Sequence, residues 1–224
     1  MPLEHTTKER LMDANEFRSF IFSGRAKFTM VNTETKNHIT YYIKSRKVKR
    51  GQDPETRFFV VDVKAIGDQI SGKVEVGEID RKKGIINVKE GIKSDYVGLV
   101  TIKWLLNHWR RLGDIINLGK LKIYHHGLCC SCGRDLEIED SIQEGIGPVC
   151  VISKVKRSLK LMKELGVQLQ EGVDFTTPVN YDVAASFAVA NFPDYLDKFY
   201  IPARLRRKDE FIGQLYELDK FGLW

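Results

Sequence analysis

The residues best suited to chemistry fall in one short stretch of the chain, between His125 and Cys150. This stretch contains every cysteine of the protein, at positions 129, 130, 132 and 150. Cys129 and Cys132 are followed by Gly133, so two thiolates can hold one metal ion on a tight turn that the glycine allows to close. Cys150 stands where an apolar-periodic helix begins and supplies a third thiolate. The pattern predicts a metal site.

A structural Zn²⁺ ion takes four tetrahedral ligands, so the cysteines leave one position to be filled. His125, four residues before Cys129, is the first candidate for that position, and His126 is the second. Cys130 adjoins a predicted ligand and cannot easily face the same ion, so we interpret it as a bystander. The expected cofactor is Zn²⁺, and its expected ligands are His125, Cys129, Cys132 and Cys150.

Two other interpretations of this stretch are open. A redox pair of Cys129 and Cys132 is less favoured, because the pair does not follow a strand in a βαβ unit. A catalytic zinc would need an open position and a general base, for which Glu144 is one candidate. The acidic residues between the cysteines could suggest a nuclease, but a solvent-facing loop explains them more simply; they are Asp135, Glu137, Glu139, Asp140 and Glu144.

The pattern H-x-G-x-C-x-x-C-G-R-x-L, followed by a serine and then by G-I-G-P-x-C, resembles the carboxy-terminal signature of a bacteriophage family of uncharacterised proteins. The matching residues are His125, Gly127, Cys129, Cys132, Gly133, Arg134, Leu136, Ser141, Gly145, Gly147, Pro148 and Cys150. The segment from Gly24 to Lys44 also resembles the upstream region of that family. The resemblance implies a phage origin and a zinc-finger-like module, and it favours His125 over His126. Cys130 departs from the family pattern, and the resemblance implies no activity.

Composition places the chain among globular proteins, with 42% hydrophobic and 29% charged residues. No apolar run approaches the roughly 20 residues that span a bilayer, and the polar start is not a signal peptide. We therefore expect a soluble protein, without a membrane partner, in the cytoplasm of a host cell. In a reducing compartment, metal binding is the expected use of clustered cysteines.

The order of apolar patterns predicts an α+β fold. Residues 1–16 read as a polar arm or a short helix. Residues 17–120 read as an antiparallel β-rich domain, or a partly closed barrel, that ends in a helix from Tyr96 to Leu112. Aromatic and β-branched residues predict strands over residues 17–32, and hairpins over residues 25–48 and 70–91. Residues 121–166 are expected to form the zinc knuckle and its helix, and residues 167–224 a helical carboxy-terminal region.

The net charge of +6 is uneven. Residues 1–120 hold 23 Lys and Arg against 15 Asp and Glu, a net charge of +8, which suits a polyanionic partner. We expect nucleic acid to contact three basic groups, which are Lys44, Arg46, Lys47, Lys49 and Arg50; Arg81, Lys82 and Lys83; and Lys156, Lys160 and Lys163. Phe28, Tyr41 and Tyr42 are candidates for stacking on exposed bases.

These patterns favour a non-enzymatic, phage-encoded nucleic-acid-binding protein with structural zinc. The chain lacks a phosphate-binding glycine loop, G-x-S-x-G, H-E-x-x-H and the deaminase pattern. The alternative is a protein-interaction module that binds a host protein complex, such as a polymerase, a nuclease or a defence system. The apolar tail, Phe221 to Trp224, either packs on the body of the protein or docks a partner.

Overall fold

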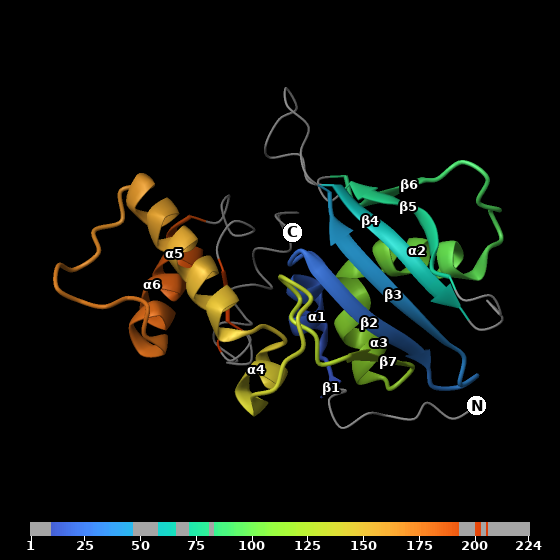
Figure 1. The fold of residues 1–224 in the computed structure, drawn as a ribbon, viewed down its shortest axis with the longest axis horizontal. Helices are drawn as coiled ribbons and strands as arrows, with labels where there is room; N and C mark the ends of the chain where they lie inside the picture. The colour runs from blue at the N-terminus through green and yellow to red at the C-terminus, as the bar shows by residue number, and fades with distance from the viewer. Residues whose placement is uncertain are drawn as a thin grey trace. The chain divides into compact units, whose positions relative to one another are not determined.

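The computed structural model describes residues 10–46, 58–65, 72–80, 83–192, 200–202 and 205. The chain divides into two compact units, Met1–Gly145 and Ile146–Trp224. The first unit contains an antiparallel sheet of seven strands, and helices follow in the carboxy-terminal half, so the fold is α+β as the sequence predicts (Figure 1). Within the described residues, no helix has the length and apolar character needed to cross a membrane.

The sheet is open, with strand order β1-β7-β2-β3-β4-β5-β6. The strands are β1 (Arg10–Leu11), β2 (Arg25–Asn32), β3 (His38–Ser45), β4 (Phe58–Ala65), β5 (Val74–Asp80), β6 (Ile85–Val88) and β7 (Leu121–His125). Strands β2 to β6 follow one another as a meander, and β7 returns from later in the chain to pair with β2. The described strands do not close into the barrel that was one expectation.

The hairpin of β2 and β3 forms because its turn residues and the alternation of buried and exposed side chains specify the same register. The side chain of Asn32 accepts hydrogen bonds from the backbone nitrogens of Glu34 and Thr35, each at 2.9 Å, which fixes the turn. The resulting register sets Phe28 opposite Tyr41. Both side chains are fully buried on the same face, where their rings stack with centroids 5.4 Å apart.

The sequence interpretation was wrong for residues 17–24, which do not extend β2. The segment Ala14–Ile21 is helix α1, because Asp13 and Glu16 form a capping box at its start. The aromatic residues of this segment suit a strand, but at helical spacing they also form one buried face that includes Phe17, Phe20 and Ile21.

The remaining helices of the first unit are α2 (Val97–Asn107), a 3₁₀ turn (Trp109–Arg111), α3 (Leu112–Asn117) and α4 (Glu139–Glu144). The helix predicted from Tyr96 to Leu112 is shorter than expected, because α2 ends at Asn107 and the 3₁₀ turn and α3 follow it. Helices α1, α2 and α3 lie on one side of the sheet (Figure 1). The ring of Phe17 packs edge-on against Phe28, and the hydroxyl of Tyr41 donates to the carbonyl oxygen of Gly98.

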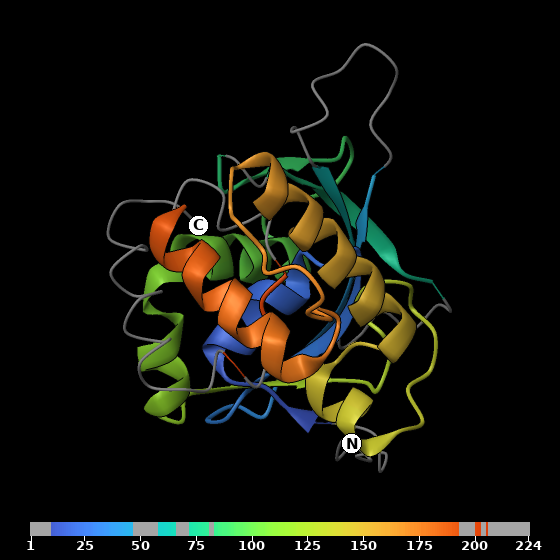
Figure 2. The same cartoon turned by 90° about the vertical axis from the view of Figure 1, so that its left-hand side faces the viewer.

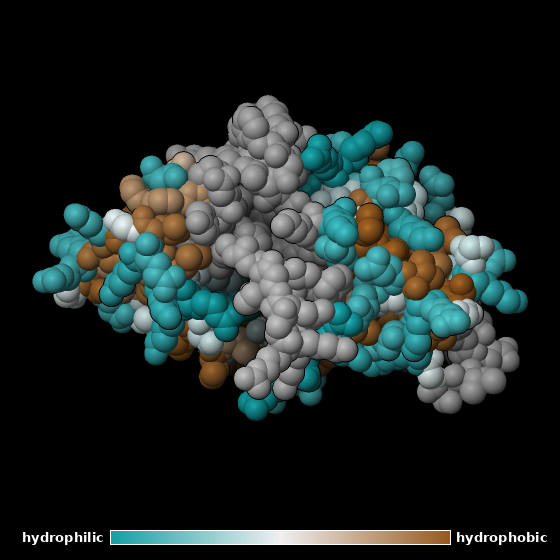
Figure 3. Space-filling view, turned by 90° about the horizontal axis from the view of Figure 1, so that it is seen from above, coloured by the Kyte–Doolittle hydropathy of each residue, from teal (hydrophilic) through white to brown (hydrophobic). Residues whose placement is uncertain are grey.

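Among the described residues, the second unit contains α5 (Pro148–Glu164) and α6 (Pro178–Asn191), which pack against each other (Figure 2). Met162 of α5 and Tyr181 and Ala185 of α6 belong to its buried core. The hydroxyl of Tyr181 donates to the carbonyl oxygen of Tyr200, whose own backbone nitrogen donates to Ser158 at 2.8 Å. On the visible face, hydrophilic side chains surround smaller hydrophobic patches in each unit (Figure 3).

Candidate metal centre

The knuckle between Gly127 and Leu136 is a compact loop held by backbone hydrogen bonds. The backbone nitrogen of Cys129 donates to the carbonyl oxygen of Arg134 at 2.8 Å, and that of Gly133 donates to the carbonyl oxygen of Cys129 at 2.7 Å. Gly133 has φ = 79°, a left-handed conformation that favours glycine and closes the turn. The loop therefore has the tight geometry that the C-x-x-C-G pattern predicts.

Three cysteine sulfurs converge at this loop. The Sγ atoms of Cys129, Cys132 and Cys150 all lie within 4.8 Å of one another, and no disulfide joins the four cysteines. Tetrahedral Zn–S bonds of about 2.3 Å would place sulfurs about 3.8 Å apart, so small side-chain movements would bring the three onto one ion. The three residues could therefore hold a metal ion, as their spacing predicts.

Cys150 reaches this position from the first turn of α5. Gly147 caps the helix and Pro148 occupies its first position, where the absence of a proline N–H costs nothing. The first turn of a helix carries the positive end of the helix dipole, which stabilises a thiolate. The G-P-x-C segment thus presents a cysteine in an environment that suits a metal ligand.

His125, the predicted fourth ligand, lies at the end of β7 and is fully buried. Its Nδ1 accepts a hydrogen bond from the backbone nitrogen of Gly127 at 3.1 Å, and its ring packs 5.7 Å from that of Phe20. Within the described residues, its Nε2 has no hydrogen-bond partner. Among the described residues, the group of converging ligand atoms contains the three cysteines and not His125. Coordination by His125 therefore stays a prediction.

Burial lowers the pKa of His125 from its usual 6.5 to about 4. The positive charge of Arg10, its partner across β1 and β7, contributes to this lowering of the pKa, while the backbone of Ile142 and the charge of Glu16 act in the opposite direction. The ring is therefore neutral at pH 7. A neutral imidazole is the form in which histidine binds a metal.

His126 and Cys130, the two neighbouring residues that could also bind the metal, make other contacts. His126 lies with its Nε2 2.7 Å from the hydroxyl of Thr29 on β2. Cys130 is buried, and its backbone nitrogen donates to the carbonyl oxygen of Gly145 at 3.0 Å. Neither belongs to the group of converging ligand atoms within the described part of the chain.

The residues predicted to contact nucleic acid have different surroundings. Lys44 forms an ion pair with Asp62 at 2.8 Å, and Arg46 forms one with Glu78 at 2.9 Å. Lys83 lies 3.9 Å from Asp80. Lys156, Lys160 and Lys163 are exposed along α5, where Lys160 lies 3.7 Å from Glu164. Lys47, Lys49, Arg50, Arg81 and Lys82 lie outside the described residues.

Two of the three aromatic residues predicted to stack on bases are core residues instead. Phe28 and Tyr41 are fully buried because strand alternation turns them toward α1 and α2. Tyr42 is turned to the other face, where it is half-buried between Lys27 and Lys73. The sequence interpretation missed these two lysines. The alternation of β2 and β3 would have placed Lys27 beside Tyr42.

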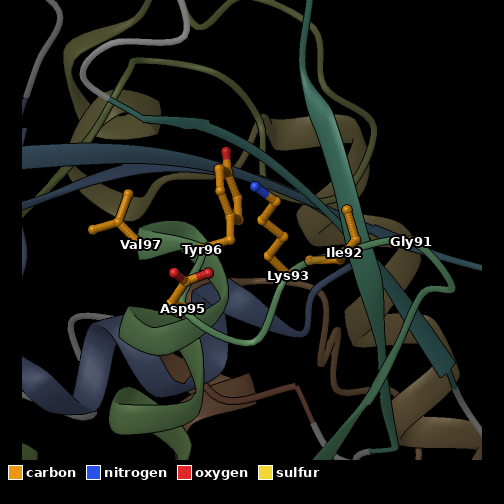
Figure 4. A pocket seen from close by; sticks show the side chains of 6 residues that line it. All are labelled: Gly91, Ile92, Lys93, Asp95, Tyr96 and Val97. Carbon is orange, nitrogen blue, oxygen red and sulfur yellow. The ribbon is translucent and has the colours of Figure 1, made fainter.

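A separate open pocket of about 400 Å³ precedes α2 and is lined by Gly91, Ile92, Lys93, Asp95, Tyr96 and Val97. The side chains of Lys93 and Tyr96 extend in the same direction, and the carboxylate of Asp95 lies below their ends (Figure 4). One lysine and one carboxylate that do not converge do not form a catalytic arrangement. The cysteine cluster is therefore the better candidate site.

Comparison with known protein families points to the same stretch. A model of a family of unknown function (DUF6011) matches residues 120–151, from β7 into the first turn of α5. The match contains Cys129, Cys132 and Cys150 as well as both neighbouring histidines. It covers a short part of the chain, so the likeness concerns the cysteine loop and not the whole protein. Neither a curated protein nor a solved structure matches this chain.

Proposed function

We propose that this protein is a zinc-containing nucleic-acid-binding protein in which the metal has a structural role. The convergence of three sulfurs within 4.8 Å supports the metal centre. Thiolates select zinc over magnesium, calcium or manganese, which prefer oxygen ligands. The knuckle also fits a structural role, because its backbone is hydrogen-bonded to itself and to β2 rather than built around an open cavity.

The charge distribution on the sheet is the observation that carries the nucleic-acid proposal. On β2, β3 and β7, every Lys, Arg, Asp or Glu side chain is a cation, and these residues are Arg25, Lys27, Lys44 and Lys122. The charged side chains of β5 are all carboxylates, at Glu75, Glu78 and Asp80. Strand β4, between them, carries Lys64 and also Asp62, which pairs with Lys44. The β7, β2 and β3 side of the sheet therefore suits phosphate groups better than the β5 side. The resemblance to phage proteins suggests that the binding takes place in the cytoplasm of a host cell.

Fluorescence anisotropy tests this proposal with the zinc-loaded chain and labelled single- and double-stranded DNA and RNA. Binding should weaken steeply as salt rises, because each neutralised phosphate releases counterions. Metal analysis of the same preparation should give one zinc per chain. No binding, or binding that does not depend on salt, would refute the nucleic-acid proposal and leave the metal centre standing.

A protein-interaction module is the second candidate, and one feature of α6 favours it. Val179, Val183 and Phe187 recur every four residues on this helix and are 75%, 68% and 50% exposed. Helix α6 carries a single charged residue, Asp182, whereas a surface helix ordinarily has a charged outer face. A host protein that co-purifies with the intact chain after nuclease treatment, and is lost with Val183→Glu but not with Lys27→Gln, would favour this candidate.

A further inference from the structure

The face of the sheet that points away from α1, α2 and α3 carries polar side chains in cross-strand rows. In one row, Lys27 on β2 lies opposite Tyr42 on β3; in the next, Thr29 lies opposite Thr40. The hydroxyls of Thr29 and Thr40 are 2.8 Å apart and hold the centre of this face in place. We call this surface the polar face.

Tyr42 is positioned on the polar face by two cations. The Nζ atom of Lys73 lies 3.6 Å from the centre of its ring, and that of Lys27 lies 5.5 Å from it. Such cation–π contacts hold the ring in one orientation and keep positive charge beside it. The ring is half-buried at its base, and Lys73 above it is exposed. Once the exposed Lys73 side chain moves off the ring face, an aromatic ring flanked by ammonium groups is suited to a ligand that has both a flat base and a phosphate.

A second tyrosine extends this arrangement toward β7. Tyr124 lies opposite Thr29, so it occupies the same row as Thr29 and Thr40. Neighbouring strands are about 4.8 Å apart and side chains on one face repeat about every 6.6 Å, so Tyr42 and Tyr124 lie roughly 12 Å apart. Arg25 and Lys27 lie on β2, between the two strands that carry the rings, and Lys122 lies on β7 with Tyr124.

We propose that the polar face over β7, β2 and β3 binds single-stranded nucleic acid, with one base stacked on Tyr42. The inference rests on the proposed function and specifies its ligand and surface. Lys27 and Lys73 contact the phosphates on either side of that base, and Tyr124 offers a second stacking position. A duplex is disfavoured because its bases are already stacked on one another, whereas a single strand exposes their flat faces.

The test uses the zinc-loaded full chain and labelled 12-nucleotide DNA and RNA strands, with a duplex of the same length for comparison. Tyr42→Leu should weaken binding of the single strands about 10-fold, the loss expected when one stacked base is removed. Tyr42→Phe keeps the ring and should bind as the unmodified chain does. Comparison of the DNA and RNA strands shows which sugar the face accepts.

The lysines are tested by the salt dependence of binding. The double substitution Lys27→Gln and Lys73→Gln should lower the slope of log affinity against log salt by about 1.4, the value for two lost phosphate contacts on a single strand. Lys103→Gln is the matched control, because Lys103 is an exposed lysine on α2.

The outcomes separate this inference from the proposed function. Absence of binding to every nucleic acid would refute both. Binding that prefers the duplex, or equal affinities for Tyr42→Leu and Tyr42→Phe, would overturn the inference and leave nucleic-acid binding intact. A slope that changes equally in the Lys103→Gln variant would place the phosphate contacts elsewhere and also overturn it.

Discussion

The backbone N–H of Arg25 donates a 2.6 Å hydrogen bond to the carbonyl oxygen of Cys130. Arg25 begins β2, so this bond attaches the cysteine knuckle directly to the sheet. The knuckle also approaches the chain closely at Gly24, the residue before Arg25. A Cβ atom on Gly24 would lie 3.0 Å from the carbonyl oxygen of Ser131. Gly24 also has φ = 135°, a backbone conformation that side-chain-bearing residues rarely adopt. The position of the knuckle on β2 therefore depends on glycine at position 24.

Gly24→Ala should lower the free energy of unfolding by about 1–3 kcal/mol, the usual cost of a residue held in a disfavoured backbone conformation. It should also weaken zinc binding, because the loop with Cys129 and Cys132 would have to move. Gly84→Ala is the matched control, since it adds a Cβ at positive φ with no atom of the described residues within 4 Å. Urea unfolding and a competing zinc chelator measure the two effects. Equal losses of zinc affinity in both variants would contradict this account.

The metal centre predicts different effects for substitution of its ligand cysteines and of Cys130. Cys132→Ser and Cys150→Ser should each weaken zinc binding by roughly 100-fold or more, because loss even of an outer partner of a ligand costs 10- to 100-fold. Cys130→Ala should keep one zinc per chain. Metal analysis after dialysis gives the stoichiometry. Full zinc content in Cys132→Ser would refute the ligand set.

The fourth ligand can be identified separately with His125→Ala and His126→Ala. If His125 coordinates, its loss should weaken zinc binding, while His126→Ala should not. Substitution with Co²⁺ provides a second measurement, because the visible spectrum of the ion reports the number of ligands and the geometry of the site. Unchanged spectra in both variants would assign the fourth position to another group, such as water.

The meander of β2 to β6 could be predicted from sequence because its information is local. Alternating residues and turn formers stand next to each other in the chain, as at Asn32 between β2 and β3. The pairing of β7 with β2 could not be predicted, because nothing near Leu121 specifies a partner some ninety residues earlier. Helix α1 was missed although Asp13 and Glu16 gave a capping signal, because the aromatic residues after them also suit a strand.

For the candidate site too, the sequence predicts the features that are local in the chain and not those that depend on distant residues. The approach of Cys129 and Cys132 can be predicted because C-x-x-C on a glycine turn is a local structure. Cys150 lies 18 residues further along the chain, and its place at the same site follows from the ligand number that a metal ion requires rather than from local structure. The burial of His125 is not local, because it depends on packing against residues far away in the chain, such as Phe20 on α1. For the same reason Phe28 and Tyr41 were assigned to a binding surface, since only the packing of helices on one face shows which side of a strand is covered.

The lowered pKa of His125 predicts a loss of stability in mild acid. Its pKa is about 4 in the folded chain and 6.5 when exposed, so the unfolded state binds the proton first as pH falls. The contribution of the neutral His125 ring to the free energy of unfolding is complete above pH 6.5. It is lost progressively as the pH falls to about 4. Between pH 7 and pH 5 the loss should be about 2 kcal/mol.

His125→Asn tests this prediction, because the amide oxygen can still accept the hydrogen bond from Gly127 but does not titrate. Urea unfolding at pH 7, 6 and 5 should show a smaller dependence on pH for this variant than for the unmodified chain. His38→Asn is the control and should keep the full dependence. Zinc content is measured at each pH, so that loss of the metal is not mistaken for protonation. Parallel pH profiles for His125→Asn and the unmodified chain would contradict the prediction.

Two helical glycines should respond in opposite directions to alanine. A Cβ on Gly98 of α2 would lie 2.6 Å from Cγ1 of Val63 and 2.8 Å from Cε1 of Tyr96, so Gly98→Ala forces α2 away from β4. Overpacking of this kind costs about 1–3 kcal/mol. A Cβ on Gly113 of α3 would meet only Ala14, at an ordinary 3.8 Å. Gly113→Ala should therefore raise stability by about 0.5–1 kcal/mol, the gain in helix propensity. Thermal unfolding of both variants checks the pair, and a loss of stability in Gly113→Ala would show that α3 packs more tightly against α1 than the structure indicates.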